Sequence, residues 1–596
     1  MTRNGTAWMR AHVFVPVFWQ FVLHAFLVGC AFLVLAHLVY AQAVPRTWLP
    51  ALWIPLGFAL QSGLIVALAA RCSRTQRQLL LGLDFLAWLG PLPGLLTASL
   101  GPATQSILLT LAIGCKLGVG LLVLHLAMRA RLSDRAAAAA LAGLALFFFL
   151  LTLTYGRVVA GNRIQLTGDE PHYLTVTASL LTDHDYYVDN QYTDGTFVQI
   201  YGAPIDRGGS GHAVPAKNGR EAPAHDLGFP TLAVPFYAMG GVPGVVVAMA
   251  IAASLLVREV FLVLRLAGIR PEVAAATTAL TSFSLPVVAY ATQAMTEIPL
   301  ALCVAFVLRR LLTGRSARWG GLSAGLALGL LPWLHVRAWP LVLPLFLTGW
   351  LVWSRWRDRL VLGAPIVILA GAYSVLIASV YGRVAASPLF FVVGGNGPYK
   401  LSSLTPHALA AAIADPWLNW SFGLLLVSPV YLLGLAGSLV LVRRGRVGIG
   451  VIASFACYAS FVGLIELWGV GPAWAPPGRF MVACTPLLAV PTGIALERLV
   501  DRGMIQLVAP LIAWTGACAF VVVTFLSIAY TPGPVVFLAN QIHVPGLLYD
   551  SITGKVPYVL FAAAAATVFL LAWVIRVANP LGPPDIDSEP VGIASR

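Results

Sequence analysis

The sequence predicts an all-α integral membrane protein with many membrane-spanning helices. Of its 596 residues, 59% are hydrophobic and 10% are charged, whereas about 25% of the residues of a soluble globular protein are charged. The mean hydropathy is +0.85, and a single soluble core cannot cover so much apolar surface. The composition therefore excludes a soluble enzyme, a disordered protein and a fibrous protein.

Apolar segments of about 20 residues, the length that crosses a bilayer as a helix, recur along the chain, and we predict about sixteen of them. They run over residues 13–40, 51–70, 79–99, 105–128, 136–157, 242–266, 273–292, 297–313, 318–335, 338–354, 359–381, 421–442, 448–468, 480–497, 506–530 and 556–577. The first segment lacks a clear small-residue cleavage site, so we interpret it as a span and not as a signal peptide.

Basic residues gather in short clusters between these segments. The clusters are Arg71/Arg74/Arg77, Arg129/Arg131/Arg135, Arg309/Arg310/Arg315/Arg318, Arg355/Arg357/Arg359 and Arg443/Arg444/Arg446. This is the positive-inside pattern of cytoplasmic loops, and it predicts that both termini are cytoplasmic. The pattern also accounts for the net charge of +14 without nucleic acid, which we exclude as a partner. Frequent Ala, Gly, Arg and Leu suggest a bacterial chain, and hence the plasma (inner) membrane.

This topology leaves three sizeable segments outside the membrane, at residues 158–228, 382–420 and 531–555. Long loops in a membrane protein are usually functional. The seven cysteines lie in apolar runs or beside a basic loop, so neither a disulfide framework nor a metal-ligand spacing follows from them.

The first outer segment contains an acidic motif at residues 168–173, Gly-Asp-Glu-Pro-His-Tyr. Pro171 suits the first turn of a helix, and apolar residues at 3–4 spacing over 171–181 predict an amphipathic helix in the membrane interface. Asp169 and Glu170 are then either a capping pair or a general base at the membrane surface. Because adjacent helical residues point about 100° apart, at most one of them is expected to face a reacting centre.

This motif, following a span and entering an amphipathic helix, resembles the first outer loop of GT-C glycosyltransferases, among them protein O-mannosyltransferases and lipid A aminoarabinose transferases. Residues 225–230 (His-Asp-Leu-Gly-Phe-Pro) and 235–237 (Pro-Phe-Tyr) resemble the family's entry to its next span. The resemblance implies a GT-C-like helix bundle and an extracytoplasmic active site that uses a polyprenyl-phosphate-linked sugar as donor.

The resemblance also suggests a division of the chain. Residues 1–135 are expected to be accessory transmembrane helices, and residues 136–500 a catalytic transmembrane module that includes the outer loop 158–228. Residues 501–578 are expected to be C-terminal transmembrane helices, and residues 579–596 a disordered cytoplasmic tail. Within the accessory helices, Lys116 lies inside an apolar segment and is expected to pair with Asp84, because a cation inside the bilayer is normally paired.

Glycosyl transfer from a lipid phosphate needs a carboxylate that accepts the proton of the acceptor hydroxyl, and cations that hold the departing phosphate. We assign Asp169 as the base and Glu170 as the second carboxylate. Outward cations are scarce, and they predict a donor-phosphate site. Its members are Arg337 with His335 at a tight outer turn, Arg479 where an outer loop enters a span, and Lys400 in the second outer segment. Snorkelling to lipid head groups is the alternative for either arginine.

Further residues are candidates for an acceptor site or a second acidic site, namely Glu297, His172, Tyr173, His225 and Asp226. For Glu297 the alternative is a first-turn carboxylate that complements the helix dipole. Four histidines, His172, His212, His225 and His335, could form a metal cluster in space, but they lack the spacing of a known metal motif. Loop polarity is the commoner explanation for each, so we assign no metal ligand. No cofactor is predicted with certainty, and dependence on a divalent cation stays open.

We therefore predict an inverting glycosyltransferase that acts on the extracytoplasmic face, with a glycan, a lipid or a protein as acceptor and membrane lipids around it. The alternative is a lipid or glycan transporter or flippase that forms no glycosidic bond, and a non-catalytic scaffold is a third reading. In a transporter we would expect charged residues deep in several spans and an internal repeat, and neither pattern is evident in the sequence.

Overall fold

The computed structural model describes residues 61–78, 81, 84, 102–129, 132–156, 158–159, 163–204, 212–313, 318–393, 405, 413–419, 423–467, 475–524 and 557–577. The chain divides into two compact units, Met1–Gln165 with Val523–Leu526, and Leu166–Val522 with Ser527–Arg596. Most of the predicted accessory helices and the predicted C-terminal tail lie outside the described residues.

The first unit contains helices α6 (Pro102–Arg129) and α7 (Asp134–Gly156), followed by a short antiparallel pair, β1 (Val158–Val159) and β2 (Arg163–Ile164). The predicted ion pair is confirmed, because Lys116 Nζ lies 2.7 Å from Asp84 Oδ1 and both side chains are fully buried. The same Lys116 nitrogen donates to Ser62 Oγ at 3.1 Å. Asp84 therefore neutralises the positive charge of Lys116 inside an apolar helix bundle.

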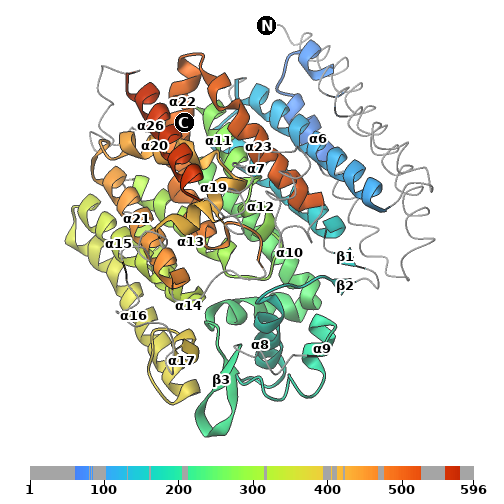
Figure 1. Cartoon of the computed structure of the whole chain (residues 1–596), viewed down its shortest axis with the longest axis vertical. Coiled ribbons are helices and arrows are strands. Elements are labelled where there is room, and N and C mark those ends of the chain that lie inside the picture. Colours follow the sequence, from blue (N-terminus) through green and yellow to red (C-terminus); the bar gives the residue numbers. More distant parts are fainter. Residues whose placement is uncertain are drawn as a thin grey trace, which may run out of the picture. The chain divides into compact units, whose positions relative to one another are not determined.

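The second unit is also built mainly of helices (Figure 1). Its elements are α8 (Glu170–Thr182), α9 (Thr196–Tyr201), β3 (Ala213–Pro215), η3 (Lys217–Gly219), β4 (Glu221–Pro223), α10 (Gly228–Leu266), α11 (Pro271–Ser282), α12 (Val287–Tyr290), α13 (Glu297–Leu312), α14 (Arg318–Leu334), η4 (Val336–Ala338), α15 (Trp339–Val352), α16 (Trp356–Tyr381), α17 (Leu389–Val393), α19 (Leu424–Val427), α20 (Tyr431–Leu441), α21 (Gly445–Leu467), η6 (Arg479–Cys484), α22 (Thr485–Asp501), η7 (Ile505–Val508), α23 (Ala509–Thr524) and α26 (Pro557–Val577).

Six segments of the described chain form helices long and apolar enough to cross a membrane. They are Asp134–Leu151, Gly228–Leu266, Trp356–Tyr381, Gly445–Leu464, Arg479–Asp501 and Ile505–Val523. Shorter apolar helices accompany them, including Trp319–Leu334 and Val336–Val352. The helical, membrane-embedded class is therefore confirmed, while the predicted number of spans involves segments outside the described residues.

Two predicted spans are wrong as continuous helices. The segment 273–292 consists of α11 and α12, separated before Pro286, and the segment 421–442 consists of α19 and α20, separated around Pro429. Proline has no amide hydrogen to donate and disfavours helical conformation in the residue before it. The prolines therefore divide segments whose composition alone reads as one span.

The helix expected to lie in the interface is buried. Helix α8 forms close to the predicted place, but all ten residues from Glu170 to Ser179 are buried. It packs against α9 and α10, so both its faces meet protein, while its position at the membrane interface stays a prediction. The 3–4 spacing of apolar residues is present, but tertiary packing covers the polar face as well.

Glycine allows close helix contact in the transmembrane part. Helices α20 and α22 pack along each other, and a Cβ added at Gly437 would lie 2.0 Å from the carbonyl oxygen of Pro491. Small residues let helix backbones approach in this way in membrane proteins. Gly437 therefore determines how near the two helices come.

The two ends of the helices differ in charge. Basic residues occupy the last turns of α10 and α13, at Arg265 and at Arg309 and Arg310. The opposite end of α10 follows the segment that contains α8, α9 and β3, which form a layer at one end of the second unit (Figure 1). The opposite end of α13, at Glu297, bonds to Arg479, which contacts Asp169. The acidic motif is thus separated from the basic clusters by the length of the helices.

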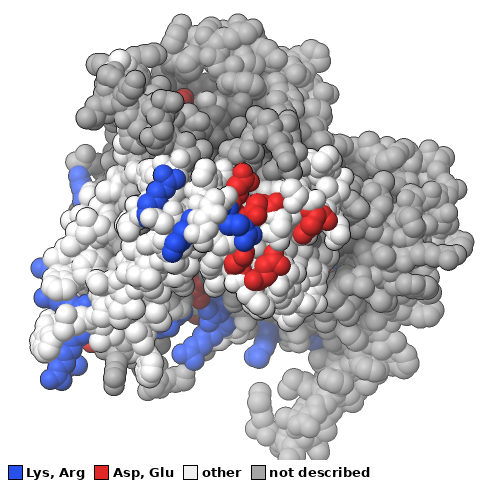
Figure 2. Space-filling model, turned by 90° about the horizontal axis from the view of Figure 1, so that it is seen from below, with Lys and Arg blue, Asp and Glu red and all other residues white. Residues whose placement is uncertain are grey.

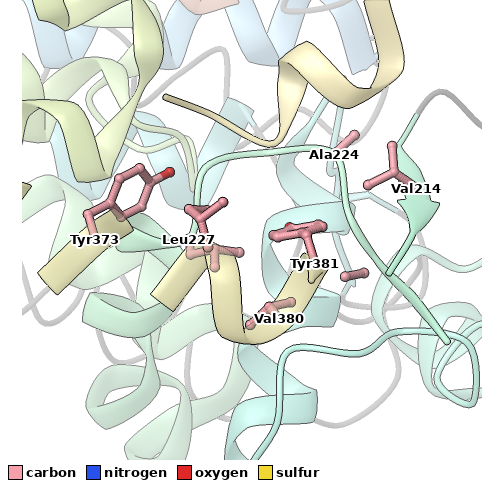
Figure 3. Close-up of a cluster of buried hydrophobic side chains, with 8 residues drawn as sticks. Val214, Ala224, Leu227, Tyr373, Val380 and Tyr381 are labelled. Carbon is pink, nitrogen blue, oxygen red and sulfur yellow. The ribbon is translucent and has the colours of Figure 1, made fainter. Parts of the chain in front are cut away.

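An apolar cluster fixes this layer to the helix bundle. Val214 of β3 packs with Tyr373 and Tyr381 of α16, together with Ala224 and Leu227 from the chain between β4 and α10 (Figure 3). The Tyr381 hydroxyl also donates to the carbonyl of Pro223 at 2.6 Å. Burial of these side chains holds the chain just before α10, where Asp226 lies.

The outer surface of this layer carries acidic and basic side chains next to one another (Figure 2). Arg220 Nε lies 2.8 Å from Asp189 Oδ1, and both side chains are partly exposed. Asp183 accepts hydrogen bonds from Asn190 and Gln191. These acidic residues belong to a solvated, hydrogen-bonded loop, and most of their partners are protein side chains.

Candidate active site

Asp169 lies at the N-terminus of α8, but its side chain does not cap the helix. Gly168 before it has φ +55°, a left-handed conformation that glycine adopts without strain, and the chain turns there into the helix. The Asp169 carboxylate instead accepts a hydrogen bond from Arg479 Nη2. Its side chain keeps 20% of its surface exposed. The capping interpretation therefore does not describe Asp169.

Arg479 lies between two carboxylates. Besides the bond to Asp169, its Nε donates to Glu297 Oε1 at 2.7 Å. Gly478 before it has φ +76° and lies against Pro286, where an added Cβ would meet the ring at 3.0 Å. This tight turn places the guanidinium at the start of η6, facing the start of α13. The predicted acid and the predicted cation, 310 residues apart in sequence, are thereby joined.

Arg337 continues the charged chain. Its Nη2 lies 3.8 Å from Glu297 Oε1, and its guanidinium carbon lies 3.6 Å from the centre of the Phe480 ring. The side chain also bonds to His335, with Nη2 at 2.8 Å from His335 Nε2. The tight turn expected here is the helix η4 between α14 and α15. Arg337 is 6% exposed, so it does not snorkel to solvent.

Asp226 ends this chain of polar groups. Its Oδ1 accepts a hydrogen bond from the Tyr373 hydroxyl at 2.6 Å, and its Oδ2 accepts one from the Val336 amide at 2.8 Å. His335 Nδ1 lies 3.9 Å from the same carboxylate. Burial raises the pKa of Asp226 to about 6, against the lowering effect of these hydrogen bonds. The carboxylate thus ties α10, η4 and α16 together beside Arg337.

Three histidines lie on the other side of Asp169. The rings of His172 and His212 stack with centres 3.7 Å apart and planes 7° apart. His212 Nδ1 lies 2.9 Å from His225 Nε2, and His172 Nδ1 lies 2.9 Å from the Tyr192 hydroxyl. The sequence offered His172, His212 and His225, with His335, as residues that could meet in space, and the structure brings these three together.

The electrostatics keep Asp169 ionised and the histidines neutral. Burial alone would raise the pKa of Asp169, but the Arg479 guanidinium holds it well below its usual range. Burial lowers the pKa of His225 to about 4 and that of His212 below its usual value. For His172, burial lowers the pKa to about 2. At neutral pH the site therefore contains an anionic carboxylate beside uncharged imidazoles.

Glu170 points away from this chain and anchors the backbone. Its Oε1 accepts the amide hydrogen of Ala294 at 2.7 Å, and its Oε2 accepts that of Thr167 at 3.0 Å. The side chain is fully buried. Asp169 and Glu170 thus face different surroundings, as expected from their helical spacing. Glu170 links the start of α8 to the segment before α13.

Tyr173 is fully buried between these groups. Its ring lies 4.9 Å from that of His225, and its hydroxyl has no hydrogen-bond partner among the described residues. Burial, together with the charges of Asp169 and Glu297, raises the pKa of this hydroxyl well above its usual value. The remaining predicted phosphate ligand, Lys400, lies outside the described residues.

Together, the fold and the site define an integral membrane protein with a buried carboxylate–guanidinium site at one end of its helices. No protein-family model and no curated protein matches the sequence. Among solved structures, the chain is similar to ArnT from Cupriavidus metallidurans, crystallised with undecaprenyl phosphate, with 16% identity and a TM-score of 0.38 over 74% of this chain and 77% of that one. ArnT is an aminoarabinose transferase of the GT-C group, the group that the sequence motifs resemble.

Proposed function

We propose that this chain is a membrane-embedded glycosyltransferase of GT-C type. It moves a sugar from a polyprenyl-phosphate donor to an acceptor hydroxyl, with Asp169 as general base and inversion at the anomeric carbon. The observation that carries the proposal is the chain of charges from the partly exposed Asp169 through Arg479 and Glu297 to Arg337. It combines a proton acceptor with two phosphate-binding groups, which are the two functions that this transfer needs.

The distribution of charge supports an extracytoplasmic site. Helix ends that carry Arg265, Arg309 and Arg310 lie away from the acidic motif, and cytoplasmic ends of spans are enriched in basic residues. With these ends inside, the layer containing α8 and β3 faces outward in the proposed bacterial inner membrane. A lipid-linked donor then reaches the site from the membrane, and its acceptor from the outer aqueous side.

The two arginines differ in how firmly they are held. Arg479 contacts the carboxylates of both Asp169 and Glu297, whereas Arg337 has its nearest carboxylate 3.8 Å away. Guanidinium groups bind two phosphate oxygens at once. We therefore assign Arg337 as the first group to bind the donor phosphate, with His335 orienting it. Arg479 is first a positioning residue for the base.

The pairing of Asp169 with Arg479 couples donor binding to base strength. A carboxylate with a strongly lowered pKa is a weak base. When the donor phosphate attracts Arg479, the guanidinium shifts its interaction from Asp169 toward the phosphate, and the pKa of Asp169 rises toward its usual value. The base is then strongest when the donor is bound, which limits transfer to the complete complex.

The remaining candidates line the acceptor side in this proposal. Tyr173 and His225 adjoin Asp169, and Asp226 fixes the chain beside Arg337. Glu297 holds both arginines, and Glu170 acts as a positioning residue for α8. The sugar and the class of acceptor, whether glycan, lipid or protein, are set by groups beyond this charged chain.

The experiment is mass spectrometry of lipid-linked and envelope glycans in a deletion strain complemented with three forms of the gene. Wild type and the control Asp194→Asn, an exposed aspartate of the same segment, should restore the missing glycan. Asp169→Asn should reach the membrane at the same level and restore none of it.

Two outcomes would overturn the proposal. Full complementation by Asp169→Asn would show that Asp169 is not the general base. In proteoliposomes, movement of a polyprenyl-phosphate lipid or a glycan across the bilayer, without a new glycosidic bond, would instead favour the alternative of a transporter or flippase.

A further inference from the structure

Three side chains of the site form a cluster with the composition of a metal centre. Asp169, His212 and His225 each offer one ligand atom, and these atoms all lie within 4.8 Å of one another. The histidine nitrogens are 2.9 Å apart, and all three side chains are half-buried. The residues come from the start of α8, from the chain before β3 and from the chain after β4.

The distances fit a bound ion. Zinc binds histidine nitrogen at roughly 2.0–2.1 Å in tetrahedral geometry, so neighbouring ligand atoms lie roughly 3.3 Å apart. The distances between the ligand atoms of the cluster run from 2.9 Å to at most 4.8 Å and so include this value. Small side-chain rotations would bring the three ligand atoms to equal distances from one ion. The other explanation of the short nitrogen–nitrogen distance is a hydrogen bond between two neutral imidazoles.

The surroundings hold the ligands in place. His172 stacks on His212 and is itself bonded to Tyr192, so the His212 ring has a fixed plane. The buried Tyr173 hydroxyl, which has no partner in the described part of the chain, lies beside His225. Fixed ligand orientation of this kind is what surrounding residues provide at metal sites.

We propose that Asp169, His212 and His225 bind one divalent transition-metal ion, with Zn²⁺ as the best match to two imidazoles and one carboxylate. Three protein ligands leave a fourth position open, which is the arrangement of catalytic and not of structural zinc sites. Arg479 contacts one oxygen of Asp169, and the second oxygen is the one that faces the ion.

Metal binding as such does not depend on the proposed glycosyl transfer. If that function holds, the open position is the place for the acceptor hydroxyl, because coordination to zinc lowers the pKa of a bound hydroxyl. Asp169 would then lie next to both the hydroxyl that loses its proton and Arg479, which in the proposed function interacts with the donor phosphate.

The test measures metal content in the purified full-length protein in detergent micelles. The protein is stripped with a chelator, incubated with equimolar Zn²⁺, desalted and analysed by elemental mass spectrometry. A second sample is loaded with Co²⁺, whose visible absorption reports tetrahedral coordination. We expect about one ion per chain and a visible cobalt band in the wild type.

The variants separate a metal ligand from a hydrogen-bonding histidine. In His212→Asn and His225→Gln an amide replaces the ring nitrogen that faces the neighbour, so hydrogen bonding is retained and metal binding is lost. Each should lower the bound metal at least tenfold and abolish the cobalt band, while its thermal unfolding without metal stays that of the stripped wild type. The control is His184→Asn, an exposed histidine in a left-handed conformation that asparagine tolerates, and it should bind as the wild type does.

Two results would overturn the inference. One is a wild type that retains no ion after desalting, and the other is a metal content that both amide variants leave unchanged. Loss of metal binding together with unchanged glycan synthesis in the complemented strain would keep the metal site and separate it from the proposed transfer. A wild type that binds the ion but forms no glycosidic bond would leave the metal site standing and count only against the transfer.

Discussion

Removal of the Arg479 guanidinium should cost more stability than removal of either carboxylate that it contacts. The Arg479 side chain is 5% exposed, and the side chain of Glu297, to which it bonds at 2.7 Å, is 4% exposed. Breaking a buried pair from one side costs about 3–5 kcal/mol because the other charge remains buried without compensation. In Arg479→Gln both Asp169 and Glu297 lose their partner, and only Glu297 retains a cation, Arg337, at 3.8 Å.

Glu297→Gln should cost less, about 1–3 kcal/mol, because Arg479 keeps Asp169 as a partner and the new amide still accepts a hydrogen bond. In the double variant the uncompensated carboxylate at position 297 is absent. The free energy of unfolding of the double variant should therefore fall by about 0.5–3 kcal/mol less than the two single losses combined, the range found for residues in direct contact.

The assay is equilibrium unfolding of the purified protein in detergent micelles with increasing dodecyl sulfate, followed by circular dichroism. A matched cycle on Arg270 and Asp501, a pair with side chains 48% and 54% exposed, should give a coupling below about 1 kcal/mol. A coupling for Arg479 and Glu297 no larger than that of this exposed pair would refute the view that the site is a buried, mutually compensated network.

Three further changes test the structure at other places. Glu170→Gln should lower the free energy of unfolding by about 1–3 kcal/mol and leave part of the activity, because this carboxylate binds backbone amides. Lys116→Met should cost about 3–5 kcal/mol in the first unit, and combining it with Asp84→Leu should recover most of that loss, as dodecyl sulfate unfolding can measure. Gly437→Ala should shift the thermal unfolding temperature downward through overpacking against a backbone carbonyl of α22, whereas Gly516→Ala, with open space around it, should not.

The sequence identified the charged residues of the site but not how they pair. Asp169 stood out because it belongs to an acidic motif that precedes a predicted amphipathic helix, and Arg479 because outward cations are scarce and it lies where an outer loop enters a span. Their direct contact, with Glu297 on the other side of the arginine, depends on how α8, α13 and η6 pack. Local spacing carries no information about contacts between residues this far apart in the chain.

Two contacts of the site could not be assigned from the sequence. His212 was one of four histidines that could meet in space, but it lies in a polar stretch without metal-type spacing, and its place beside His225 follows from the β3–β4 pairing that brings the two segments together. Tyr373 cannot be distinguished in the sequence from the other residues of its predicted span, although its hydroxyl donates a hydrogen bond to Asp226. A buried tyrosine in a helix usually has a hydrogen-bond partner, but the sequence does not say which one.

Two predicted spans, 273–292 and 421–442, were wrong as continuous helices for a different reason. Hydropathy reports which residues avoid water, and it is equally high on both sides of Pro286 and Pro429. The helix ends there because of backbone geometry, which composition does not express. The interruption before Pro286 has a structural consequence, since Gly478 packs against this proline and thereby places Arg479 opposite Glu297.

Acidic side chains beside a proposed phosphate site look contradictory at first, because carboxylates repel the anion that the arginines are meant to bind. A buried guanidinium without a partner is, however, strongly unfavourable, and a site of this kind must be stable before the donor arrives. Glu297 and Asp169 supply the negative charge beside Arg479 in the structure. Under the proposed function, the donor phosphate replaces part of this charge when it binds. Because one of the two carboxylates is also the proposed base, that proposal makes donor binding the same event that releases Asp169 to accept a proton.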